Sequence, residues 1–134
     1  MLLPWRRDAD VIVVFVAVLL VNFRFDKINI LKERLFVAVN EEDIDLTRRY
    51  AFELYTITRD FQNVTGDTPL HIAVLTGNKE LIATLLSVYP GLIDIENNAG
   101  LTPVKLAAGD KEMLSLIIDI FNICKAHEES KSKK

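Results

Sequence analysis

Few side chains in this sequence could carry out chemistry, and their spacing does not match any catalytic pattern. The chain has two histidines, His71 and His127, and a single cysteine, Cys124. No Cys/His pair has the spacing of a zinc site, and no glycine-rich loop could hold a phosphate group. A Gly-x-Ser-x-Gly nucleophile elbow is also missing. These residues therefore predict no catalytic centre, no metal site and no bound cofactor.

The acidic residues and the cysteine have simpler structural interpretations. Glu41-Glu42, Asp43 and Asp45 could form a carboxylate pair, but negative side chains also stabilise the first turn of a helix. We therefore expect this cluster to start a helix. Cys124 lies among apolar residues near the C-terminus, so we expect a buried structural thiol. A single cysteine excludes an intramolecular disulfide and suits a reducing compartment.

Composition limits the class of protein. The chain has 134 residues, of which 50% are hydrophobic and 26% charged, which are ordinary values for one folded domain. The net charge of −3 argues against a general nucleic-acid binder, because phosphate contacts need clustered Lys and Arg. The only basic cluster, residues 131–134, lies at the end of a polar tail.

Residues 66–86 have the pattern of a helix pair. Thr68 can cap a helix whose first turn carries Pro69, and Leu70 begins its apolar face. Gly77-Asn78 can end that helix in a left-handed conformation, and a second apolar set with helical spacing follows. Helices this short are marginal alone, so the pair needs neighbours.

The neighbours are predicted by fixed offsets along the chain. Residues 100–108 repeat the pattern of residues 66–74 at an offset of 34, with Gly100, Thr102 and Pro103 at the positions of Gly66, Thr68 and Pro69. An earlier unit is predicted to have helices at residues 31–40 and 43–54 and a connector at residues 55–65. Such offsets are typical of a repeat architecture.

Residues 66–73 closely resemble the Gly-x-Thr-Pro-Leu-His-x-Ala signature of ankyrin repeats, and residues 100–107 repeat it with Val104 and Lys105 replacing Leu and His. This resemblance implies an all-α solenoid of about three stacked units, at residues 31–65, 66–99 and 100–127. Residues 1–30 are expected to form a degenerate half-repeat or buried helix, and residues 128–134 a disordered tail. In the family, the residue at the position of His71 hydrogen-bonds the backbone of adjoining units. The implied structural residues are Gly66, Thr68, Pro69, Leu70, His71, Gly77, Gly100, Thr102 and Pro103.

The same resemblance implies a protein partner rather than a substrate. Ankyrin units bind partners through the tips of their loops, called fingers, and through the inner face of each first helix. Residues 66–86 also resemble the ankyrin domains of inhibitors of NF-κB-type transcription factors, which implies a Rel-type partner and a cytoplasmic or nuclear protein. The implied contact residues are Gln62, Val64, Thr65, Asp67, Leu75, Thr76, Glu96, Asn98, Ala99 and Leu101.

Residues 11–23, an apolar run interrupted only at Asn22, allow three interpretations: a transmembrane helix, a signal sequence, or a buried helix or strand. The run is shorter than the roughly 17–25 residues that a span needs. Asp8 and Asp10 offset the charge of Arg6-Arg7, as a signal sequence would not. We therefore favour burial; the alternatives are a membrane-attached or secreted ankyrin protein, and a fragment of a longer one. If the run were exposed, a membrane, a partner or a second copy would have to cover it.

Overall fold

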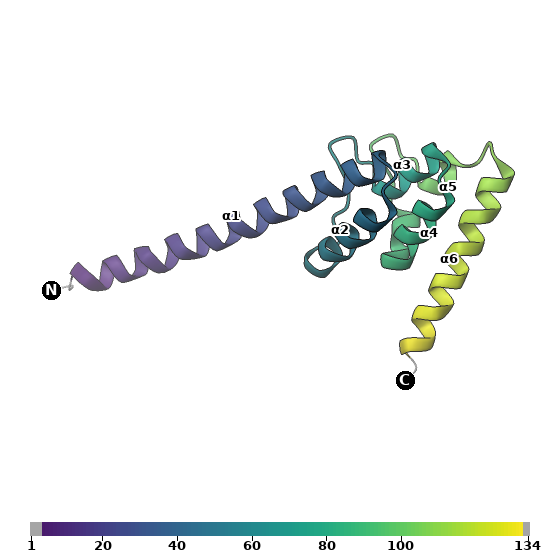
Figure 1. Ribbon diagram of the computed structural model, residues 1–134. Coiled ribbons are helices and arrows are strands. Elements are labelled where there is room, and N and C mark those ends of the chain that lie inside the picture. The colour runs from purple at the N-terminus through teal and green to yellow at the C-terminus, as the bar shows by residue number, and fades with distance from the viewer. Residues whose placement is uncertain (1–3, 133–134) are drawn as a thin grey trace.

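The computed structural model describes residues 4–132 of the chain, and all regular secondary structure in this part is helical (Figure 1). The first helices of successive pairs, α1, α3 and α5, contact one another in one layer, and the second helices, α2, α4 and α6, do so in the other. This arrangement confirms the prediction of an all-α stack of three helix pairs. The elements are α1 (Pro4–Asn40), α2 (Ile44–Ile57), α3 (Pro69–Thr76), α4 (Lys79–Val88), the 3-10 helix η1 (Pro90–Asp94), α5 (Pro103–Leu106) and α6 (Lys111–Ser132).

The caps of the central helix pair follow the predicted pattern. The Thr68 side chain accepts a hydrogen bond from the backbone N–H of His71, and Pro69 occupies the first turn of α3. Gly77 ends α3 with a φ of 74°, in the left-handed region that favours glycine. Asn78 then caps α4 by accepting a hydrogen bond from Leu81 N at 3.1 Å.

The acidic cluster before α2 is a helix start, as predicted. Asp43 caps α2, and its carboxylate accepts a hydrogen bond from Leu46 N at 3.0 Å. The helix continues to Ile57, three residues beyond the predicted end at residue 54.

One continuous hydrophobic core joins the three pairs. Each pair contributes fully buried side chains, so each apolar face is covered by the next unit, as a repeat stack requires. The largest of these side chains include Leu35 from α1, Leu54 from α2, Leu70 from α3, Leu85 from α4 and Ile117 from α6.

The predicted helix start at residue 31 is wrong, because α1 is one uninterrupted helix of 37 residues, Pro4–Asn40. Residues 5–40 contain neither glycine nor proline, the strongest breakers of a helix, so the helix continues through the stretch. The N-terminal segment, considered as a degenerate half-repeat, therefore has no helix of its own and is the outer half of α1.

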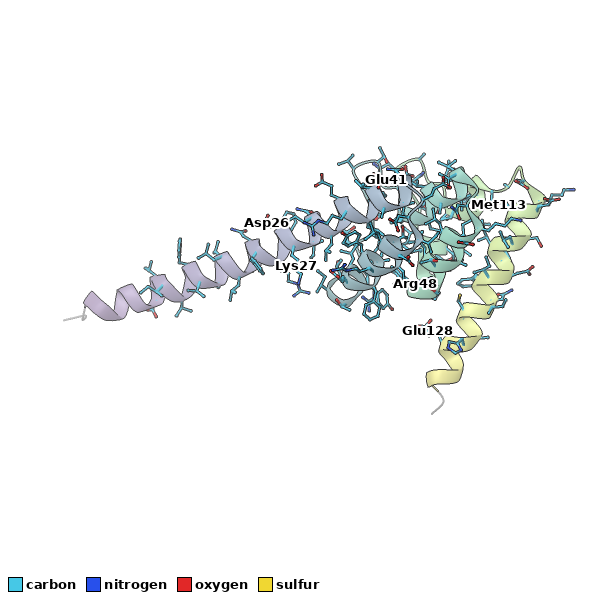
Figure 2. All side chains as sticks on the ribbon, viewed as in Figure 1. Asp26, Lys27, Glu41, Arg48, Met113 and Glu128 are labelled. Atoms are coloured by element: carbon cyan, nitrogen blue, oxygen red, sulfur yellow. The ribbon has the colours of Figure 1, made fainter. Side chains whose placement is uncertain are left out.

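The prediction that residues 11–23 are buried is also wrong. The large apolar side chains from Val11 to Phe25 are 46–70% exposed. Figures 1 and 2 show this half of α1 projecting away from the stack, with side chains on all sides. Packing ends near Arg24, whose Nη2 donates a hydrogen bond to the last carbonyl of α2, Ile57 O, at 2.9 Å. Within residues 4–132, no helix is long and apolar enough to cross a membrane.

The C-terminal prediction also needs correction, because α6 runs to Ser132 rather than ending near residue 127. Residues 125–132 contain two Lys, two Glu and one Ala, which favour helix, and they continue an existing helix without a glycine or proline. The expectation of disorder is therefore wrong as far as Ser132, and residues 133–134 lie outside the described residues.

Candidate protein-binding surface

The first connector, residues 58–68, forms a finger whose tip is held by one side chain. Asn63 Oδ1 accepts hydrogen bonds from Thr65 N, Thr65 Oγ1 and Asp67 N, at 3.0, 2.8 and 3.0 Å. The turn closes with a bond from Gly66 N to Asn63 O at 3.0 Å, and Gly66 has a φ of 81°. The finger tip is therefore a preformed turn rather than a loose loop.

The second finger, residues 95–102, repeats this construction. Asn97 Oδ1 accepts hydrogen bonds from the backbone N–H groups of Ala99 and Leu101, both at 3.0 Å. Asn97 follows Asn63 at the same offset of 34 that relates the two motifs. Neither asparagine was among the predicted contact residues, although this shared offset was the available signal.

Hydrogen bonds from side chains and backbone join the two fingers into one surface. Several predicted contact residues are committed to this network, so they shape the surface as well as lie on it. The bonds are Asn98 N to Thr65 O at 3.0 Å, Asn98 Nδ2 to Val64 O at 3.1 Å, Asn97 Nδ2 to Asp67 Oδ1 at 2.9 Å, and Gln62 Nε2 to Glu96 O at 2.9 Å.

His71 is fully buried and links the second repeat to the third. Thr68 N donates to His71 Nδ1 at 3.0 Å, so Nδ1 is an acceptor and the ring proton lies on Nε2. Nε2 then donates to Leu101 O at 2.8 Å. Lys105, at the corresponding position of the next unit, instead donates to Gly100 O within its own finger. The histidine therefore fastens neighbouring units and is shielded from solvent.

Cys124 does not have the environment of a reactive thiol. Its side chain is half-buried on α6, and this burial raises the pKa of the thiol because a thiolate would lose hydration. In the described part of the chain, no three His, Cys, Asp or Glu side chains are grouped closely enough to hold a metal ion.

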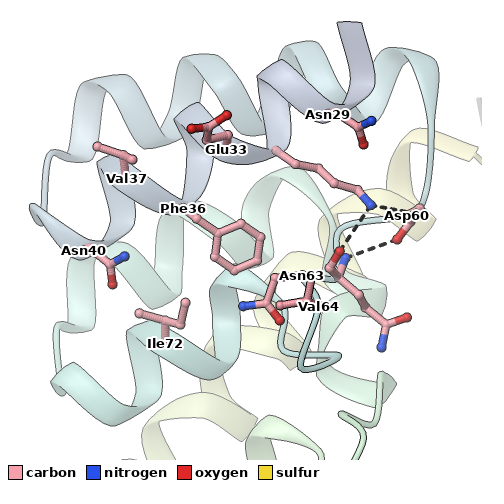
Figure 3. Close-up of a pocket in the computed structure, with 11 residues that line it drawn as sticks. Asn29, Glu33, Phe36, Val37, Asn40, Asp60, Asn63, Val64 and Ile72 are labelled. Carbon is pink, nitrogen blue, oxygen red and sulfur yellow. Dashed lines mark hydrogen bonds and ion pairs between the residues drawn. The ribbon is translucent and has the colours of Figure 1, made fainter. Parts of the chain in front are cut away.

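An open groove of about 690 Å³ lies between α1, the first finger and α3 (Figure 3). Its wall on α1 spans residues 29–40, its second wall is the finger, and Ile72 contributes from α3. The lining residues are Asn29, Lys32, Glu33, Phe36, Val37, Asn40, Asp60, Gln62, Asn63, Val64 and Ile72.

The groove combines four apolar side chains with polar ones and is nearly neutral in charge. Phe36 lies between α1 and the finger in Figure 3, and Val64 at the finger tip is 96% exposed. Lys32 Nζ forms an ion pair with Asp60 at 2.7 Å and donates to Gln62 O at 3.1 Å, which ties α1 to the finger. Among the lining residues this pair leaves Glu33 as the remaining charge.

The predicted contact residues separate into three groups. Gln62 and Val64 line the groove. Leu75, which is 69% exposed, and Thr76 follow Ile72 on the same side of α3, at i+3 and i+4. The remaining ones lie on the two finger tips, beside the groove rather than in it: Thr65, Asp67, Glu96, Asn98, Ala99 and Leu101.

The wall that α1 supplies was not among the predicted contact residues. Phe36 and Val37 lie within an unbroken apolar run, residues 35–39, whose core-facing members are Leu35, Ala38 and Val39. A single helix face cannot bury the whole of such a run, because 3.6 residues complete one turn. The surplus apolar residues were the signal for an exposed surface on the first repeat.

Comparison with known proteins agrees with this geometry. No curated protein and no solved structure matches the chain. A family model described as ankyrin repeats (3 copies) matches residues 35–127, which is more than two thirds of the sequence. Together with the stacked helix pairs and paired fingers, this match shows that the chain belongs to the ankyrin repeat family.

Proposed function

We propose that this protein is a non-enzymatic binding module that holds or sequesters a protein partner in the groove between α1, the first finger and α3. Ankyrin repeats are protein-interaction modules, so the function of this chain depends on which partner its surface fits. The observation that carries the proposal is Val64, a large apolar side chain that is 96% exposed on a preformed turn and lines the groove. Exposed apolar groups on a rigid scaffold are typical of binding surfaces.

The lining chemistry favours one kind of partner segment. Phe36, Val37 and Ile72 offer an apolar floor for a partner's aliphatic or aromatic side chain. Amide groups such as those of Asn29 and Asn40 both donate and accept hydrogen bonds, which suits the backbone of an extended segment. The charge of Glu33 favours a basic residue beside the apolar anchor over an acidic one.

The predicted contact residues take two roles in this proposal. Val64, Leu75 and Thr76 contact the partner directly. Gln62, Thr65, Asp67 and Asn98 hold the fingers in place through the network described above, and Glu96, Ala99 and Leu101 border the same surface. Substitutions in the second group therefore weaken binding by changing the finger shape.

The experiment is quantitative affinity capture from cell extract with the full chain and two single variants. Val64→Asp places a charge at the finger tip, and Phe52→Asp is the matched control, since Phe52 is 61% exposed on α2 in the other layer. We expect Val64→Asp to lose at least about tenfold of the captured partner, because a charge in an apolar contact costs well over 1.4 kcal/mol. The control should retain it. Equal capture by both variants would contradict the assignment of the groove.

A Rel-type transcription factor is one partner that this proposal admits. Its support is the resemblance of residues 66–86 and the preceding connector to the ankyrin domains of inhibitors of such factors. The single cysteine suits the reducing cytoplasm or nucleus, where such a partner would be met. Failure of the purified chain to bind any Rel-type factor would remove this finer assignment and leave the groove proposal in place.

A further inference from the structure

One side of α1 is selected by the polar residues that lie between its apolar outer end and the groove. The large apolar side chains from Val11 to Phe25 surround the helix, so they do not select a side by themselves. The residues that line the groove from α1 recur in steps of three and four, and the same steps continue towards the N-terminus. We call this line of residues the groove-side stripe: Asn22, Asp26, Asn29, Glu33, Phe36 and Asn40.

The groove-side stripe is turned away from the core and from α2. Leu31 and Leu35, which are buried in the first repeat, each follow a stripe residue by two positions, about 200° around the helix. Arg24, which contacts the end of α2, likewise follows Asn22 by two positions. Every stripe residue is exposed except Phe36, which is half-buried. A second helix laid along the stripe therefore meets neither the core nor α2.

The charges along this part of α1 are sorted by side. Asp26 and Glu33 lie seven residues apart on the stripe, about 10 Å along the helix axis. Each is followed directly by a basic residue, Lys27 or Arg34, which lies about 100° around the helix and therefore off the stripe. Figure 2 shows Asp26 and Lys27 on different sides of α1. In the part of the chain that the structure describes, neither carboxylate forms an ion pair or a hydrogen bond, so the stripe presents two uncompensated negative charges.

Apolar side chains extend the same line beyond both carboxylates. Phe36 lies one turn beyond Glu33, in the groove. Val18 lies one turn before Asn22 and is 50% exposed. The order along this side of α1 is therefore apolar, acidic and apolar, over about 27 Å from Val18 to Phe36.

We propose that the partner held in the groove continues along the groove-side stripe as an amphipathic helix, with basic residues beside Asp26 and Glu33 and apolar residues beside Val18 and Phe36. This inference rests on the proposed function, because the groove is where the partner segment enters. Charge complementarity selects basic residues over acidic ones. Since the two carboxylates are two helical turns apart, basic residues seven positions apart on a second helix match them.

The helical conformation of the partner segment follows from what α1 offers. Outward of Asn29 the segment lies beside a single helix, whose backbone groups are already bonded within α1. The N–H and C=O groups of the segment that face α1 must therefore be bonded within the segment itself, as they are in a helix.

The first test measures the binding of two synthetic peptides to the full chain by fluorescence anisotropy. Both peptides are helices of about 22 residues with leucines along one side, and they differ only at two positions seven residues apart on that side. These positions are lysine in the basic peptide and glutamate in the acidic one. We expect the basic peptide to bind at least about tenfold more tightly at low salt, and the ratio to fall as salt screens the exposed charges. Circular dichroism should show a gain of helix when the basic peptide binds, because an isolated helix of this kind is marginal.

Charge reversal separates the stripe from the net charge of −3. Asp26→Lys with Glu33→Lys should reverse the preference, so that the acidic peptide binds more tightly. Glu80→Lys with Asp119→Lys makes the same change in net charge at exposed residues of α4 and α6, in the other layer, and should keep the preference of the wild-type chain. Circular dichroism of each variant confirms that the fold is retained.

The outcomes of this test are distinct. A wild-type chain that does not distinguish the two peptides, or a control variant that reverses as fully as the stripe variant, would overturn the proposal. Binding without a gain of helix would overturn the helical conformation of the partner segment. Self-association of the full chain that the stripe variant abolishes would assign the stripe to a second copy instead.

The second test adds Asp26→Lys to the partner-capture experiment. Asp26 does not line the groove, so this variant leaves the groove and Val64 unchanged. We expect Asp26→Lys to lose captured partner and Asp119→Lys to retain it. Retention by Asp26→Lys alongside a loss with Val64→Asp would overturn this inference and leave the groove proposal in place. Equal capture by Val64→Asp and Phe52→Asp would instead contradict the groove, and with it the point where the helix enters.

Discussion

Replacing Gly66 by alanine tests whether the two fingers act as one unit. Gly66 has a φ of 81°, and a Cβ at this position would lie 2.5 Å from Asn98 Oδ1 and 2.6 Å from Asn98 N. Both distances are shorter than a real Cβ contact, so the second finger would have to move. Asn98 donates to Thr65 O and Val64 O, and both hydrogen bonds would be strained or lost.

Gly100 is the matched control, because it occupies the same place in the second finger. Its φ is 77°, but a Cβ there would meet nothing within 4 Å. Gly100→Ala should therefore lower the free energy of unfolding only by the cost of holding an alanine in the left-handed conformation, about 1–2 kcal/mol. Gly66→Ala should lower the free energy of unfolding by the same conformational cost. It should also lose two hydrogen bonds of about 1 kcal/mol each, for a total of about 3–4 kcal/mol.

The assay is urea unfolding followed by circular dichroism, with the free energy taken from linear extrapolation. Gly66→Ala should also weaken partner capture, since the tip that carries Val64 is held by the same hydrogen bonds. A difference between the two alanine variants below about 1 kcal/mol would contradict the coupling of the two fingers, because the contact with Asn98 would then contribute nothing measurable.

Other variants probe single groups in the stack. His71→Leu removes the bond to the third repeat and leaves buried polar groups unpaired, so it should cost about 2–4 kcal/mol in urea unfolding. Lys105→Leu at the corresponding, exposed position should change stability by under about 0.5 kcal/mol, and equal effects would contradict the role of His71. The buried hydroxyl of Thr47 has no hydrogen-bond partner among the described residues, so Thr47→Val should raise stability by about 1 kcal/mol; a loss would show that the hydroxyl is satisfied. Burial raises the pKa of the Cys124 thiol, so its alkylation at neutral pH should be slower than that of an unfolded control. The alkylation rate should also increase at a higher pH than it does in the control. Equal rates would show an exposed thiol.

The central repeat was predictable because its signals are local. Thr68, Pro69 and Gly77 each determine the backbone of their own turn, so the ends of α3 follow from residue type and order. The start of α1 was not predictable by the same reasoning. A repeat pattern predicts where a unit should begin, but only a glycine, a proline or a capping residue ends a helix, and residues 5–40 have neither glycine nor proline.

The candidate site was predictable on the fingers and not on α1. Val64 and Gln62 could be identified because the signature that follows them fixes their place in a finger. The first repeat lacks that signature, so Phe36 and Val37 could not be placed on its inner face by motif. Burial of residues 11–23 was expected from their composition, but burial depends on a neighbour within reach, and α2 ends beside Arg24.

Because α1 has no break, its two halves form one rigid rod about 55 Å long, at 1.5 Å per residue. Its outer end bears the exposed apolar side chains between Val11 and Phe25, and its inner end is a wall of the groove, joined to the finger by the ion pair of Lys32 and Asp60. Whatever contacts the outer half of the rod is therefore held at a fixed distance from the groove, about 28 Å between Ala17 and Phe36 at 1.5 Å per residue.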